Sequence, residues 1–259
     1  MKKILSIILA LTTILSTLHL ISCGKAKDGE TLERLATKTP YELYTAERAS
    51  IGKANHYTIT TTKVITQSTA MGGGVSTETT LTKLGGDNAY AKITNSKSPS
   101  ATTEAWFIAE EGLTYASTSE DKTRYSDSLS GFTKNYLNRN ASDLIMLNVG
   151  EEVFEEKKFE RSGDYWVVSF VLTDEAYQNF IINVFTTGIF DISSLPEGDV
   201  TYKIYFTDSG KLAKTVTSYD VSSMSGGSHC EITTEINLSD VSVTPPADAS
   251  SYEYFNPQQ

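Results

Sequence analysis

The sequence predicts an α+β domain in which one antiparallel sheet is combined with a few helices. Most of the chain between residues 56 and 239 consists of short β-branched segments separated by turns that contain glycine, proline or serine. Two segments begin with a residue that can cap a helix, continue with acidic residues in the first turn and end at a glycine. This order is typical of a helix. Residues 165–173 are apolar on both faces, which predicts a central strand covered on both sides.

The first 22 residues are typical of a lipoprotein signal peptide. Two lysines precede an apolar run over residues 4–20, and Leu20-Ile21-Ser22-Cys23 resembles the bacterial lipobox. A lipobox cysteine is acylated and becomes the first residue of the mature chain, and two or more acyl chains give stable membrane attachment. We therefore predict lipid attachment at Cys23. The alternative is an uncleaved N-terminal helix with a chance cysteine.

The chain divides into four predicted regions. Residues 1–22 are the signal peptide, and residues 23–38 hold the lipidated cysteine and a polar tether. Residues 39–246 form a single domain, which Pro245-Pro246 closes, and residues 247–259 are a C-terminal tail.

The charge of the chain limits its partners. The sequence has 32 acidic and 22 basic residues, a net charge of −10, and two of the lysines lie in the signal peptide. Such a surface repels phosphate backbones, so no nucleic acid is expected as a partner. Cys230 is the only other cysteine, so the core is expected to form without a disulfide.

The elements follow in order along the chain. A first helix is predicted over residues 39–54, with Thr39 as N-cap, Pro40 at its first position and Glu42 completing a capping box. Its weak apolar stripe is Leu43, Ala46, Ala49 or Ser50, and Ile51. Five strands of a meander follow over residues 56–67, 75–85, 88–97, 102–110 and 112–121.

The second half of the chain contains further helices and strands. Residues 130–150 are predicted to form one or two short helices, and residues 151–160 fit a strand or a helix equally well. Residues 173–188 have the capping, first-turn acids and wide apolar stripe of an amphipathic helix. Three strands then follow, over residues 199–206, 211–223 and 229–239.

No catalytic or metal-binding motif occurs in the sequence. On a strand, His229 and Glu231 face one way and Cys230 the other, so one metal ion cannot collect all three. The acidic pairs near residues 151–156 adjoin two lysines and indicate a solvated surface. The sequence therefore predicts a non-catalytic protein with no metal and no cofactor.

The order of these elements resembles that of the LolA-like and LppX/LprG-like lipoproteins, and the local residue pattern over 105–125 and 202–219 is also similar. The resemblance implies a strongly curved antiparallel sheet of about 9 to 11 strands, an open half-barrel whose concave face is covered by helices. A cavity between sheet and helices takes acyl chains in that family. Residues 143–149 and 176–185 correspond to the lid.

The resemblance also implies which side chains line the cavity. These candidates are Trp106, Phe107, Leu144, Ile145, Trp166, Val168, Phe170, Phe180, Ile181, Val184, Phe185, Tyr202, Ile204 and Phe206. The predicted function is that of a membrane-anchored, extracytoplasmic lipoprotein that binds a lipid or other hydrophobic ligand. In the alternative, the same residues fill a solid core, and the protein is a surface module that binds an envelope protein.

Overall fold

The structure is a computed structural model that describes residues 35, 37–68, 73–137, 147–178, 180, 196–223 and 226–256. Residues 38–259 form one compact unit, which holds all the elements given below, and residues 1–37 form another. Cys23 and most of the predicted tether lie outside the described residues. Within the described part of the chain, no helix has the length and apolar character needed to span a membrane.

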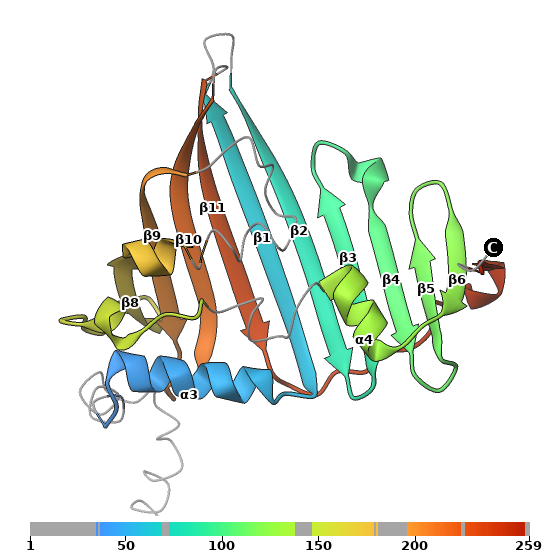
Figure 1. The fold of residues 1–259 in the computed structure, drawn as a ribbon, viewed down its shortest axis with the longest axis horizontal. Helices are drawn as coiled ribbons and strands as arrows, with labels where there is room; N and C mark the ends of the chain where they lie inside the picture. The colour runs from blue at the N-terminus through green and yellow to red at the C-terminus, as the bar shows by residue number, and fades with distance from the viewer. Residues whose placement is uncertain are drawn as a thin grey trace, which may run out of the picture. The chain divides into compact units, whose positions relative to one another are not determined.

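Twelve strands form one open sheet in the order β12-β6-β5-β4-β3-β2-β1-β11-β10-β9-β8-β7 (Figure 1). All neighbours are antiparallel except β12 and β6. The strands are β1 (His56–Ser68), β2 (Gly74–Gly85), β3 (Asn88–Asn95), β4 (Thr103–Ile108), β5 (Leu113–Ser117), β6 (Lys122–Ser126), β7 (Glu160–Ser162), β8 (Tyr165–Val171), β9 (Glu197–Phe206), β10 (Leu212–Ser223), β11 (Gly226–Asn237) and β12 (Glu253–Tyr254). The predicted antiparallel meander and its three closing strands are confirmed.

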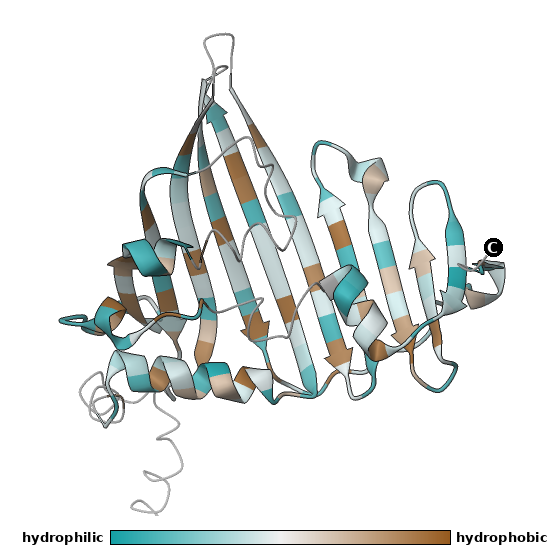
Figure 2. Ribbon diagram, viewed as in Figure 1, coloured by the Kyte–Doolittle hydropathy of each residue, from teal (hydrophilic) through white to brown (hydrophobic). Residues whose placement is uncertain are grey.

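Two connections of the meander contain a glycine with positive φ. Gly86 (φ 65°) lies between β2 and β3, and Gly112 (φ 61°) lies between β4 and β5. Other residues rarely adopt this conformation, which explains glycine at these two turn positions. Apolar residues recur in bands across neighbouring strands, as expected when side chains alternate between two faces (Figure 2).

The first predicted helix is confirmed as α3 (Pro40–Gly52). The Thr39 hydroxyl accepts a hydrogen bond from the backbone N–H of Glu42 at 3.2 Å, and the Glu42 carboxylate accepts one from the backbone N–H of Thr39 at 2.8 Å. The buried side chains are Leu43, Tyr44, Glu47 and Ile51. The apolar stripe was therefore predicted only in part, since Ala49 and Ser50 are exposed.

Further helical segments lie within the described residues. They are η1 (Pro99–Ala101), α4 (Leu129–Phe132), the π-helical η2 (Thr133–Leu137), η3 (Glu151–Phe154), the helical residues 174–178 and η4 (Ala249–Ser251). The open question about residues 151–160 is thus decided: a 3-10 turn precedes an irregular stretch that leads into β7. Most of the lid predicted from the family resemblance lies outside the described residues.

Two features differ from the sequence predictions. Strand β8 is second from an edge of the sheet rather than central, and Val171 on its outer side is 48% exposed. The chain also continues to pack beyond Pro246, where the domain was predicted to close. Tyr252 is buried, and β12 extends the sheet beside β6.

Candidate functional site

One face of the sheet carries most of the predicted ligand-binding residues. We call it the helix-side face, because Phe107 on β4 contacts Phe132 of α4 there, with ring centroids 6.2 Å apart. Residues that are paired across neighbouring strands share a face. The pairing of residues between neighbouring strands therefore shows which side chains lie on this face, for every strand from β8 to β5.

The predicted wall residues of β8 and β9 lie side by side on this face. Three cross-strand pairs form the wall: Trp166 with Phe206, Val168 with Ile204, and Phe170 with Tyr202. Each of the six side chains is at most 4% exposed. These six side chains form one apolar surface, and their role in binding a ligand stays a prediction.

Aromatic side chains from η3 and α3 cover the wall. The Phe154 ring centroid lies 5.3 Å from that of Phe170 and 5.2 Å from that of Tyr44. The Tyr44 hydroxyl donates a hydrogen bond to the Leu147 carbonyl at 3.0 Å. Burial raises the pKa of Tyr44 and of Tyr202, because an apolar surrounding disfavours the phenolate. Both hydroxyls are neutral at physiological pH, so they add no charge to the wall.

A second apolar cluster lies on the same face over β3 and β4. It consists of Ala89, Ala91, Ala105, Phe107 and Phe132, with Leu84, Leu129 and Tyr136 at its margin. The alanines leave room for the aromatic rings of α4 and η2, and the Phe132 and Tyr136 centroids are 5.0 Å apart. Phe107 thus lies on the predicted face, but it is several strands away from the wall of β8 and β9.

Between the two clusters, β10, β11, β1 and β2 form a floor that is rich in threonine. Its central row, from cross-strand pairing, is Thr215, Thr234, Thr61 and Thr80. The hydroxyls of Thr61 and Thr234 are 3.2 Å apart and hydrogen-bonded. Hydroxyls satisfied in this way let the threonine methyl groups provide an apolar surface.

Isoleucines adjoin the threonine row and remain partly exposed. They are Ile65 on β1, Ile93 on β3 and Ile232 on β11. Phe180 packs on the wall side of this floor, with its ring centroid 5.7 Å from that of Tyr219. Lys63 and Glu78 pair across β1 and β2 on the same face, next to Ile232 and between Thr61 and Ile65 of β1, and place charged groups within the floor.

Trp106 lies on the other face of the sheet, because it directly precedes Phe107 on β4. Its ring packs against Tyr90 and Tyr252, with centroids 5.2 and 6.4 Å away. Trp106 and Phe107 therefore cannot line the same cavity. Five further candidates lie outside the described residues: Leu144, Ile145, Ile181, Val184 and Phe185.

A hydrogen-bonded chain of three side chains lies on the β10–β11 hairpin, and no sequence motif predicted it. His229 Nδ1 lies 2.8 Å from Asp220 Oδ1, and His229 Nε2 lies 3.2 Å from Ser218 Oγ. The His229 and Asp220 side chains are 50% and 76% exposed, so water competes for these bonds. As predicted, the Cys230 side chain is buried on the opposite face. No group of three metal-binding side chains occurs in the part of the chain that the structure describes.

No family model and no curated protein matches this chain. Three solved structures are similar to it over most of its length. A DUF1329 family protein from Desulfovibrio piger is 11% identical, with a TM-score of 0.28, and covers 80% of this chain and 96% of its own. A LolA superfamily protein from Nitrosomonas europaea is 11% identical, with a TM-score of 0.25, and covers 79% and 96%.

The third structure is an outer membrane lipoprotein-sorting protein domain from Vibrio parahaemolyticus. It is 12% identical, with a TM-score of 0.23, and covers 75% of this chain and 90% of its own. Among these three, the protein from Nitrosomonas europaea carries the name of the LolA superfamily, which the sequence resembles.

Proposed function

We propose that this protein is a lipid-anchored protein of the bacterial cell envelope that binds a lipid or similar hydrophobic ligand on the helix-side face. The observation that carries the proposal is the continuity of this face. The apolar wall of β8 and β9 passes into a floor of threonine and isoleucine methyl groups, and the isoleucines remain partly exposed.

The chemistry of the floor suits an amphipathic ligand. An acyl chain needs a long apolar surface with few polar groups, and the partly exposed Thr61, Thr80 and Ile93, which are paired across β1, β2 and β3, provide part of one. Lys63 and Glu78 beside this row would meet the polar head of the same molecule. The proposed anchor at Cys23 favours transfer or reception at the membrane over free diffusion.

Organic extraction followed by mass spectrometry tests the proposal. The protein is purified from bacterial membranes, and the extract is analysed for lipid that is not covalently attached. One bound lipid per chain is the expected result, because a stoichiometric ligand requires a defined site. A folded protein that carries no lipid would contradict the proposal.

A surface module with a solid core is the second candidate. Its supporting observation is that Val168, Ile204 and Phe206 have no exposed surface at all, so side chains fill this end of the face. An empty protein that instead retains an envelope protein during purification would favour this candidate.

A further inference from the structure

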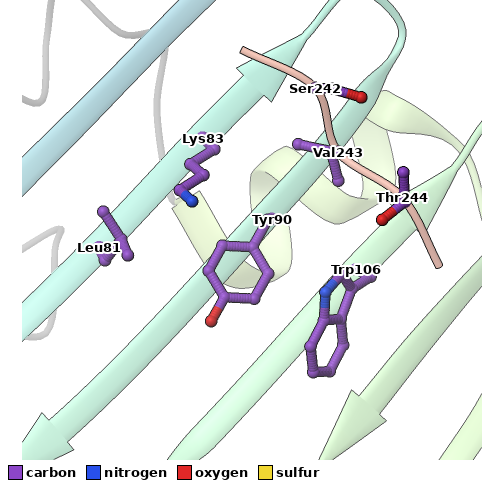
Figure 3. Close-up of a pocket in the computed structure, with 7 residues that line it drawn as sticks. All are labelled: Leu81, Lys83, Tyr90, Trp106, Ser242, Val243 and Thr244. Atoms are coloured by element: carbon purple, nitrogen blue, oxygen red, sulfur yellow. The ribbon is translucent and has the colours of Figure 1, made fainter. Parts of the chain in front are cut away.

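A pocket of about 250 Å³ lies on the face opposite to the one proposed for lipid (Figure 3). Its lining residues are Leu81, Lys83, Tyr90, Trp106, Ser242, Val243 and Thr244. The first four come from β2, β3 and β4, and the last three come from the segment that follows β11. The pocket therefore joins parts of the chain that are more than 130 residues apart.

The C-terminal segment is held in place by backbone contacts. The Asn88 side-chain amide donates a hydrogen bond to the Val243 carbonyl at 3.0 Å. His56 Nδ1 lies 3.4 Å from the Val241 carbonyl. Gly85 allows the close approach, since a Cβ atom there would lie only 2.6 Å from the Val241 oxygen. One wall of the pocket is thus fixed without any contribution from a ligand.

Aromatic rings form the floor of the pocket. Tyr90 and Trp106 are paired across β3 and β4, and their ring centroids are 5.2 Å apart with an interplanar angle of 51°. Both side chains are partly exposed, unlike the buried rings of the helix-side wall. Tyr252 contacts the Trp106 ring in an edge arrangement and supports it from outside the pocket. The floor therefore offers rigid aromatic surface to a ligand.

Polar groups surround the aromatic floor. Among the residues that the structure describes, Lys83 is the only charged one that lines the pocket, and its Nζ lies 5.7 Å from the centroid of the Tyr90 ring. The nearby Glu104 carboxylate is occupied, because it pairs with Lys92 at 2.6 Å and accepts from the Tyr90 hydroxyl at 3.2 Å. Ser242 and Thr244 line the pocket across from Lys83 (Figure 3). The pocket therefore combines an aromatic floor with one cation and two hydroxyls.

We propose that this pocket binds one ring of an acidic saccharide. A sugar ring has an apolar face of C–H groups, which packs on aromatic rings, and hydroxyls at its edge, which bond to Ser242, Thr244 and Lys83. A carboxylate on the ring pairs with Lys83. The volume is below the roughly 300 to 1,000 Å³ of sites for larger ligands, so one ring fits and a long acyl chain does not.

Tryptophan fluorescence tests the inference, because the chain has only two tryptophans, Trp106 and Trp166. Trp166 is buried in the wall, so in the Trp166→Phe variant of the full chain Trp106 is the only reporter. The probes are glucuronate and its neutral counterpart glucose. We expect a saturable change of Trp106 emission with both sugars and tighter binding of glucuronate.

Substitutions separate the contributions of the ring and the charge. Lys83→Gln should weaken glucuronate binding about threefold, as for an exposed ion pair, and leave glucose binding unchanged. Tyr90→Ala should abolish the response to both sugars. Tyr205→Ala is the matched control, because Tyr205 is a partly exposed tyrosine on the same face of the sheet but lies on β9.

Three results would overturn the inference. They are the absence of a saturable response to either sugar, a response that survives Tyr90→Ala, and a response to laurate in place of the sugars. Saturation-transfer NMR on the unsubstituted protein gives the same answer if Trp166→Phe does not fold. Lipid extraction reports on the other face, so failure of this inference and failure of the proposed function are distinguishable.

Discussion

The Glu47 carboxylate accepts a hydrogen bond from the backbone N–H of Leu212 at 3.1 Å. This bond joins α3 to the first residue of β10. Glu47 is 7% exposed, and Lys211 Nζ lies 3.5 Å from its other oxygen. Burial of an acidic side chain in the first helix is explained by these two partners, which fix α3 beside the end of the sheet.

Glu47→Ala should lower the free energy of unfolding by about 1 to 3 kcal/mol, because the buried N–H of Leu212 loses its acceptor. Glu47→Gln is the control, since its amide oxygen can still accept that bond and the loss should be smaller. Urea denaturation measures both variants. Equal loss in the two would mean that charge pairing with Lys211, and not the bond to Leu212, fixes the helix.

Gly85→Ala should displace the C-terminal segment, because the added Cβ would lie 2.6 Å from the Val241 carbonyl oxygen. Gly74→Ala on the same strand is the control, with no atom within 4 Å of its added Cβ. Limited proteolysis after β11 measures the difference. Faster cleavage is expected only for Gly85→Ala, and equal rates in the two variants would show that the segment is held mainly by other contacts.

Tyr57→Phe should reduce the loss of stability at alkaline pH. Burial raises the pKa of Tyr57 from 10.0 to about 12. The unfolded chain loses this proton near pH 10 and the folded chain keeps it, so stability is constant below pH 10 and falls as pH rises toward 12. Tyr57 should account for about 2 to 3 kcal/mol of this loss of unfolding free energy.

Urea denaturation of the wild type and of Tyr57→Phe between pH 8 and about pH 11 measures this share. Their difference in unfolding free energy should change with pH only above pH 10. A difference that is constant across the range would contradict the predicted cause.

Ile232→Asp should abolish lipid retention, because it places a carboxylate on the proposed apolar floor. Thr233→Asp is the matched control: the neighbouring residue on β11 is also partly exposed but faces the other side of the sheet. Mass spectrometry of organic extracts compares the two. Retention of lipid by a folded Ile232→Asp protein would exclude this floor as the site.

Cys23→Ala should abolish incorporation of a labelled fatty acid into the protein in growing bacteria, because the thiol is the predicted point of attachment. Cys230→Ala is the control and should leave the labelling unchanged. Labelled Cys23→Ala protein would contradict the predicted anchor.

Local sequence signals predicted the elements that depend on neighbouring residues. The capping box of Thr39 and Glu42 defined α3, because both hydrogen bonds join residues three apart. The alternation of side chains along a strand predicted that His229 and Cys230 lie on opposite faces of β11. The predicted central position of β8 was wrong, because an apolar pattern indicates that a strand is buried but does not specify which strands lie beside that strand.

The sequence by itself determined the acidic charge, the predicted lipid anchor, the capped first helix and the antiparallel meander. Only the tertiary structure decided that Trp106 and Phe107 serve opposite faces in different clusters, and that residues 242–244 complete a pocket with Tyr90. The physical reason is the distance along the chain over which each kind of interaction acts. Helix caps and strand alternation act between residues a few positions apart, whereas a pocket forms where distant segments pack together, and their contacts depend on the whole fold.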